Sequence, residues 1–183
     1  MKKQVLMSIS LIVVGIFLLG MASVAVAGNE IVGAPKCKTC HKAKTGDQWA
    51  KWEASKHAGA FATLGTDAAK KIATEKGLGD PQKEEACLKC HTTHGFLGRD
   101  VVVNATGKYL DSEGVGCEAC HGAGSEYKSK KVMVDHDAAV AAGMTMEKTE
   151  EFCTKCHNAE SPTFTDFVLA ERWATIAHPV PEK

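Results

Sequence analysis

The chain has 183 residues, with 22 basic and 22 acidic side chains, so its formal net charge is zero. Its length predicts a single domain, and the balanced charge argues against a nucleic-acid-binding protein. The sequence contains no glycine-rich phosphate loop, hydrolase nucleophile elbow or zinc-protease motif, which argues against those enzyme classes.

The N-terminus has the pattern of a secretory signal peptide. Two lysines precede an apolar run over residues 5–21, and Ala25-Val26-Ala27 then offers a cleavage site. We expect residues 1–27 to be removed as a signal peptide and residues 28–183 to form the mature domain, in the periplasm or outside the cell. If the segment were retained, it would be long enough to anchor the chain in a membrane.

The mature chain repeats one motif four times, Cys-x-x-Cys-His. This is the attachment motif of c-type haem, in which two thiols form thioethers and the histidine is the proximal iron ligand. Zinc sites and disulfides also use paired cysteines, but neither needs a histidine after every second cysteine. We therefore expect four covalently attached haem c groups. The attachment cysteines are Cys37, Cys40, Cys87, Cys90, Cys117, Cys120, Cys153 and Cys156, and the proximal histidines are His41, His91, His121 and His157.

The first half of the mature chain is predicted to be mainly helical. Residues 45–64 have a helical spacing that places His57 on one face beside small alanines. His57 is therefore a candidate second ligand of an iron. A second helix is predicted over residues 67–76, and a short helix after Asp80-Pro81 is expected to carry the second motif and to stop at Gly95. The single strand signal is a small β-ribbon, expected from residues 101–103 and 108–110.

The second half of the chain supplies two more candidate ligands. Glycines surround the third motif over residues 114–124, and their missing Cβ atoms let the backbone approach a flat macrocycle. A short helix over residues 135–142 carries His136 near its start, and a last helix over residues 166–177 leads to His178. The methionines near the first of these helices are expected to pack rather than to bind iron.

The fold class follows from the ratio of chain to cofactor. A mature domain of 156 residues with four haems has about 39 residues to cover each macrocycle, so the haems are expected to supply much of the buried surface. We expect a mainly α fold with little regular structure, a core of haem and one small β-ribbon.

His94 complicates the count of iron ligands. Four histidines remain beyond the proximal ones, His57, His94, His136 and His178, which suggests four six-coordinate irons. Two axial histidines have Cα atoms about 12 Å apart, whereas the three residues from His91 to His94 reach about 10–11 Å. His94 is therefore not expected to bind the same iron as His91. It is an unligated histidine, a ligand for a neighbouring subunit, or a ligand of another haem in the same chain.

The chain resembles the cytochrome c-554 family of tetrahaem electron carriers over most of its mature length. The resemblance rests on Lys42 after the first motif, Trp49 and His57 downstream, the Gly95-Phe96 pair and the glycine-rich third motif.

The resemblance implies a pattern of iron ligation. His57 would bind the haem on His121, His136 the haem on His41, and His178 the haem on His157. The haem on His91 would be five-coordinate, and His94 departs from the family at this point.

These features favour an electron carrier that exchanges electrons with donor and acceptor proteins and binds no organic substrate. A haem enzyme is the first alternative, acting on nitric oxide, hydroxylamine or peroxide at an open haem on His91. The second alternative is a subunit of a conducting extracellular filament, in which His94 binds a haem of the next copy. Such a head-to-tail contact does not close and therefore propagates.

Overall fold

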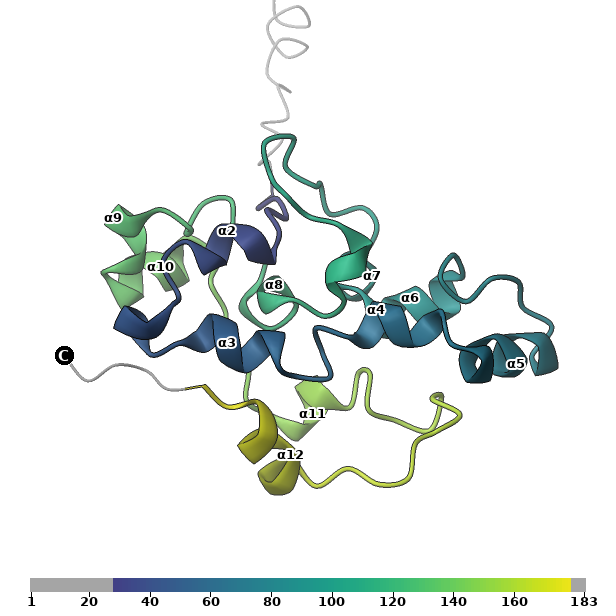
Figure 1. Cartoon of the computed structure of the whole chain (residues 1–183). Helices are drawn as coiled ribbons and strands as arrows, with labels where there is room; N and C mark the ends of the chain where they lie inside the picture. The colour runs from purple at the N-terminus through teal and green to yellow at the C-terminus, as the bar shows by residue number, and fades with distance from the viewer. Residues whose placement is uncertain (1–27, 179–183) are drawn as a thin grey trace, which may run out of the picture.

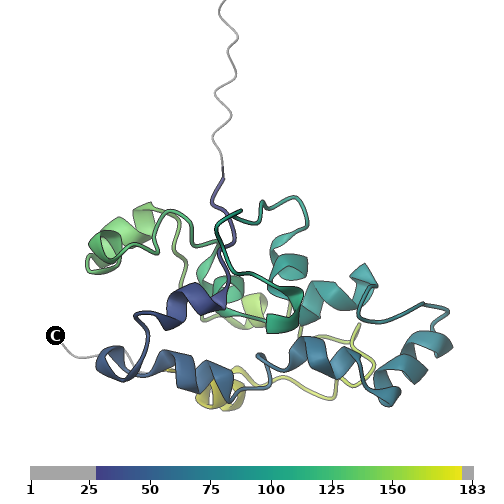
Figure 2. The ribbon, with the colours of Figure 1, turned by 45° about the horizontal axis from the view of Figure 1, so that its top comes forward.

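The computed structural model describes residues 28–178, and the expected signal peptide lies outside them. Short helices joined by long loops make up the described chain (Figures 1 and 2). The α-helices are α2 (Ala34–Lys38), α3 (Gln48–Glu53), α4 (Ala60–Leu64), α5 (Asp67–Glu75), α6 (Glu85–His91), α7 (Thr93–Leu97), α8 (Cys117–His121), α9 (Lys130–Met133), α10 (His136–Ala141), α11 (Glu150–Cys153) and α12 (Leu169–Ile176). Two 3₁₀ turns, η1 (Ala43–Thr45) and η2 (Asp111–Glu113), complete the described elements.

The expectation of a mainly helical chain with little regular structure is confirmed. Side-chain caps start several of the short helices: Thr66 accepts from Ala69 N at α5, and Asp135 accepts from two backbone amides at α10. These caps satisfy amides that a short helix leaves without partners. None of the described helices is both long and apolar enough to span a bilayer.

The single helix expected over residues 45–64 is wrong. The chain forms α3, then turns through residues 54–59, and resumes as α4. His57 lies in that turn, where its carbonyl accepts hydrogen bonds from Ala60 N and from Val115 N, at 3.1 and 2.9 Å. A contact with a segment 58 residues away therefore replaces the helical hydrogen bonds that the local pattern favours.

The small β-ribbon is not formed among the described residues. Ile31 makes a single parallel bridge to Val103 instead, with Ile31 N bonded to Val102 O and Asn104 N bonded to Ile31 O. Lys108 N bonds to Val32 O. The extended lead-in to α2 therefore takes the hydrogen bonds that the two arms of the expected ribbon would have exchanged.

The boundaries of two other expected helices also shift. The helix of the second motif ends at His91, and α7 follows it, because Thr92 accepts from Gly95 N and starts a new helix before Gly95 is reached. The last helix, α12, begins at Leu169 and ends at Ile176, so His178 follows the helix instead of sharing its face. The helices expected over residues 67–76 and 135–142 are confirmed as α5 and α10.

The polypeptide core is small. Ile31, Val32 and Ala34 from the lead-in are buried with Ala119 and Ala123 from the third motif region. The largest fully buried side chains of the described residues include one carboxylate and two threonines. Few large apolar side chains of the described residues are therefore fully buried.

Candidate haem-binding site

The four motifs start or end short helices. The first spans the end of α2, the second closes α6, the third forms α8, and the fourth begins at the end of α11. All eight cysteines are free thiols. Burial raises the pKa of Cys87 and Cys153, and it raises the pKa of Cys120 to about 11. These positions therefore favour an uncharged sulfur, and a thioether is uncharged.

The motifs lie next to one another in an order that differs from the sequence. The thiols of Cys37 and Cys117 are hydrogen-bonded, so the first motif adjoins the third. Cys120 of the third motif interacts electrostatically with Cys153 of the fourth.

The fourth motif in turn adjoins the second. The thiols of Cys90 and Cys156 are hydrogen-bonded. Phe96 and Phe152, which follow and precede these motifs, pack edge to face with ring centroids 5.5 Å apart. An ion pair between Lys89 and Glu160 joins the same two regions. The spatial order of the motifs is thus first, third, fourth, second.

Two pairs of histidines have the spacing of axial ligands. The ring centroids of His57 and His157 are 6.0 Å apart, and those of His121 and His178 are 5.9 Å apart. Two imidazoles on opposite faces of one iron have centroids about 6 Å apart, because each metal–nitrogen bond is about 2 Å long and the ring adds about 1 Å. Both spacings therefore fit an iron between the rings.

These pairs differ from those that the resemblance implied. The structure places His57 beside the proximal histidine of the fourth motif rather than the third, and His178 beside that of the third rather than the fourth. Phe167 stacks on the His157 ring at 5.2 Å and fixes its position.

The four paired histidines are held in the form that binds a metal. Burial is the main cause that lowers the pKa of His57, His121, His157 and His178. A lowered pKa favours the neutral imidazole, whose ring nitrogen has a free electron pair.

Backbone carbonyls orient two of the proximal histidines. His91 Nδ1 lies 2.7 Å from Ala60 O, and His121 Nδ1 lies 2.9 Å from Thr145 O. Because a carbonyl only accepts, Nδ1 carries the proton in both rings and Nε2 is left to bind a metal. A hydrogen bond of this kind is the usual partner of a metal-binding histidine.

His41 and His136 are placed less closely. His41 interacts electrostatically with His121 and His178, which agrees with the contact between the first and third motifs. The side chain of His136 is 63% exposed, and its Nδ1 lies 3.4 Å from Asp137. Among the described residues, no ring contact brings His136 to another histidine.

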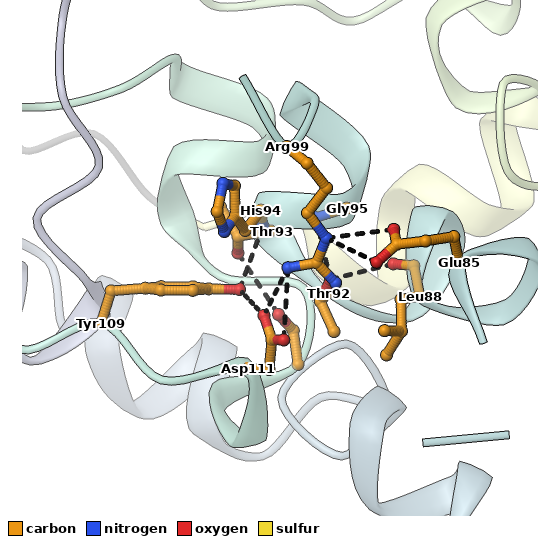
Figure 3. Close-up of polar contacts among 10 residues, drawn as sticks. Glu85, Leu88, Thr92, Thr93, His94, Gly95, Arg99, Tyr109 and Asp111 are labelled. Atoms are coloured by element: carbon orange, nitrogen blue, oxygen red, sulfur yellow. Dashed lines mark hydrogen bonds and ion pairs between the residues drawn. The ribbon is translucent and has the colours of Figure 1, made fainter. Parts of the chain in front are cut away.

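His94 points into the protein. Its Nε2 is buried and has no hydrogen-bond partner among the described residues. Its ring meets the Tyr109 ring edge to face at 6.0 Å, and its backbone N–H donates to the Tyr109 hydroxyl at 3.0 Å. The Tyr109 hydroxyl donates a hydrogen bond to Asp111, and Asp111 also forms an ion pair with Arg99 (Figure 3). An unsatisfied buried nitrogen is costly, so this atom fits an additional ligand such as an iron.

Sequence reasoning missed the carboxylate inside the third motif. Glu118 is 2% exposed and accepts from Val32 N, Gly33 N and Gly124 N at 2.9, 2.7 and 2.7 Å. It therefore joins the lead-in to the third motif. An acidic residue between two haem cysteines, in a stretch of small residues, was the available signal.

Comparison with known proteins shows that the chain is similar to multihaem cytochromes. A family model described as cytochrome c554 and c-prime matches residues 36–122, which include the first three motifs. Cytochrome c-554 of Nitrosomonas europaea is 28% identical over 176 residues, which is 84% of this chain and 68% of that protein. The C-type polyheme cytochrome OmcC of Geobacter sulfurreducens is 29% identical over 91 residues, which is 45% of this chain and 11% of that protein. No solved structure matches the chain.

Proposed function

We propose that the chain is a c554-type multihaem cytochrome that binds four haems and conducts electrons along them between two redox partners, as its similarity to this family supports. Each Cys-x-x-Cys-His motif would hold one haem through its two cysteines and its histidine. The bound haem supplies one-electron redox chemistry, and the protein supplies axial ligands, burial and orientation.

The observation that carries this proposal is the spacing of the two histidine pairs. His57 with His157 and His121 with His178 would each give an iron two imidazole ligands. An iron with two histidines has no free position for a substrate, so it is suited to electron transfer rather than to ligand chemistry.

The arrangement of the motifs supports a conducting path. The interactions between Cys37 and Cys117, Cys120 and Cys153, and Cys90 and Cys156 favour the order first, third, fourth, second. In this order the first and second haems are the two ends of the path, where donor and acceptor proteins would exchange electrons.

A small-ligand enzyme is the second candidate, and one observation favours it. His91 is held by Ala60 O on one side, and no other histidine ring packs against it among the described residues. The iron of the second motif would then have one free position, where nitric oxide, hydroxylamine or peroxide could bind.

The position of His94 favours its binding an iron of its own chain over its binding an iron of a neighbouring copy. A trans ligand must present its nitrogen to the solvent, whereas His94 Nε2 is buried. Association into a filament through this residue is therefore the less favoured proposal.

The proposed location is the periplasm or the cell exterior. The signal-like N-terminus supports export, and haem is attached to such motifs outside the cytoplasm.

The test is a potentiometric titration of the haem-loaded protein, followed visibly and by electron paramagnetic resonance. We expect four reversible one-electron steps, with low-spin signals from the paired irons. His57→Ala and His178→Ala should each convert one low-spin iron to high spin at an unchanged haem content. Spectra that both variants leave unchanged would exclude these two residues as ligands.

Carbon monoxide distinguishes the carrier from the enzyme. If the second haem is open, the reduced wild-type protein should bind carbon monoxide at about one quarter of its haem. If every iron has two ligands, its visible spectrum should not shift, and the enzyme proposal fails.

A further inference from the structure

We propose that the lysine-rich face formed by α2, η1 and α3 docks the acidic surface of a redox partner protein beside the first haem-binding motif. This inference rests on the proposed electron transfer and adds where one partner binds and what its surface carries. The basic face is defined here as residues 36–56.

The basic face has a strong local charge on a neutral chain. Residues 36–56 hold six lysines against two acidic residues, a formal net charge of +4. The zero net charge of the whole chain does not reveal this local excess of lysine. The six are Lys36, Lys38, Lys42, Lys44, Lys51 and Lys56.

Most of this charge is exposed and not neutralised. Lys42, Lys44, Lys51 and Lys56 are exposed and form no ion pair within the described part of the chain. One pair does occur in the basic face, between Lys38 and Glu53 at 3.9 Å. The surface therefore still has charge available for a partner.

Hydrogen bonds fix the turn in the middle of the basic face. Trp49 N bonds to His41 O, and Asp47 N bonds to Lys42 O, both at 2.9 Å, so the turn that carries Lys42 and Lys44 is closed against the first motif. A fixed arrangement of charge loses little conformational freedom when a partner binds.

The two tryptophans of the basic face are already engaged. Trp49 and Trp52 pack with ring centroids 4.8 Å apart, and Trp52 Nε1 donates to Val115 O. They are therefore not free to stack on bases, which favours an acidic protein over a nucleic acid as the occupant.

The basic face lies where electrons would enter or leave. Cys40 is the one exposed cysteine among the haem-motif cysteines of the described residues, and α2 and α3 lie side by side, on the side of the molecule away from α5 (Figures 1 and 2). The first motif is also an end of the proposed path, because its neighbour is the third motif. A partner on this face would approach the terminal haem.

A second copy of the chain fits this face less well. The acidic segment that could meet it, residues 147–171, has a formal net charge of −4. That segment surrounds the fourth motif, which contacts both the third and the second motifs and is thus interior to the path. A copy docked there would not continue the path from its end.

The test uses two small oxidants of opposite charge. The reduced, haem-loaded protein is mixed in a stopped-flow instrument with hexacyanoferrate(III), an anion, or with hexaammineruthenium(III), a cation. Each oxidant molecule takes one electron from the protein. In Lys42→Glu/Lys44→Glu at low salt, oxidation by the anion should slow by about tenfold, and oxidation by the cation should quicken. Both effects should shrink as the Debye length falls to about 8 Å near 0.15 M salt.

The matched control is Lys70→Glu/Lys71→Glu, which changes the net charge equally on α5 at the far end of the molecule (Figure 1). We expect its rates to change less than about twofold. Equal effects of the two variants would overturn the inference, because the net charge alone would then govern the rate.

Poly-L-glutamate probes the chemistry of the partner. It should slow oxidation of the wild-type protein at low salt and leave the Lys42→Glu/Lys44→Glu variant unaffected. If sedimentation instead shows that the wild-type protein self-associates at low salt and the variant does not, the occupant is a second copy and the inference fails. Failure of the proposed function would look different, because neither oxidant would then remove electrons from any variant.

Discussion

At the scale of single residues, the buried carboxylate of Glu118 joins the start of the mature chain to the third haem motif. It accepts two backbone hydrogen bonds from Val32 and Gly33, which precede it by 86 and 85 residues, and a third from Gly124, which follows it by six residues. Backbone amides that lose a buried acceptor cost about 1–3 kcal/mol each. Glu118 therefore holds these two segments together in a molecule whose apolar core is small.

The first prediction concerns the stability that Glu118 provides. Glu118→Gln replaces one carboxylate oxygen by an amide that donates, so it should lower the free energy of unfolding by about 1–3 kcal/mol. Guanidinium unfolding of the haem-loaded protein measures this. The matched control is Glu126→Gln at an exposed position, which should change stability by less than about 0.5 kcal/mol. An equal loss in the two variants would contradict the role of Glu118.

A second prediction concerns pH. Burial raises the pKa of Glu118 in the folded protein, although three backbone amides oppose this. The folded protein then binds more protons than the unfolded chain between the two pKa values, so stability falls as pH rises.

The stabilisation from this proton should be complete below the ordinary glutamate pKa of about 4.3 and lost as pH rises through the folded-state value. Because glutamine does not titrate, the advantage of wild type over Glu118→Gln should shrink with increasing pH in that window. Unfolding curves at pH 4 to 8 test this, and an advantage that grows with pH would reverse the sign.

At the scale of helices, local sequence predicted the elements that depend on local signals. The helix over residues 67–76 and the helix of His136 each have their own cap and pattern, and both were confirmed. The helix expected through His57 was wrong because the turn there is set by Val115 N, which no local pattern reveals. The expected β-ribbon was wrong among the described residues for the same reason, since Ile31 and Val32 take its hydrogen bonds.

In the candidate site, too, features set by local sequence were predictable and features set by distant contacts were not. The cysteines and proximal histidines can be recognised from spacing alone, because one motif contains them. The partners of His57 and His178 depend on how distant loops pack, so neither could be derived from the sequence.

A prediction at this scale concerns the junction of α6 and α7. Thr92 is fully buried, donates to Leu88 O and accepts from Gly95 N, so it ends one helix and starts the next. Thr92→Val keeps the shape but removes both bonds, and it should lower the free energy of unfolding by about 1–2 kcal/mol. It should also perturb the spectrum of the haem proposed on His91, the residue before it.

The control for this prediction is Thr66→Val. Thr66 caps α5 by the same kind of bond, but it is exposed and lies outside the haem motifs. Its loss should cost a similar amount, about 1 kcal/mol, without changing any haem signal. Visible and near-infrared spectra of the two variants separate the structural effect from the effect on the iron.

At the scale of the whole molecule, the spatial order of the motifs makes the third one the link between the first and the rest. The first motif adjoins the third through Cys37 and Cys117, and the third adjoins the fourth through Cys120 and Cys153. If each motif carries a haem as proposed, removing the third haem should therefore interrupt the path. Removing the second should only shorten it, since the second motif contacts the fourth.

The matched variants are Cys117→Ser/Cys120→Ser and Cys87→Ser/Cys90→Ser, each of which should carry three haems in place of four. When the protein is reduced by dithionite in a stopped-flow instrument, the variant without the third haem should show two separate phases. Its first haem no longer equilibrates with the fourth and second. The variant without the second haem should keep one continuous path through its three haems and reduce as a single unit. The opposite result would be two phases in the variant without the second haem and one phase in the variant without the third. The second motif, rather than the third, would then be the junction, and the proposed order of the motifs would be wrong.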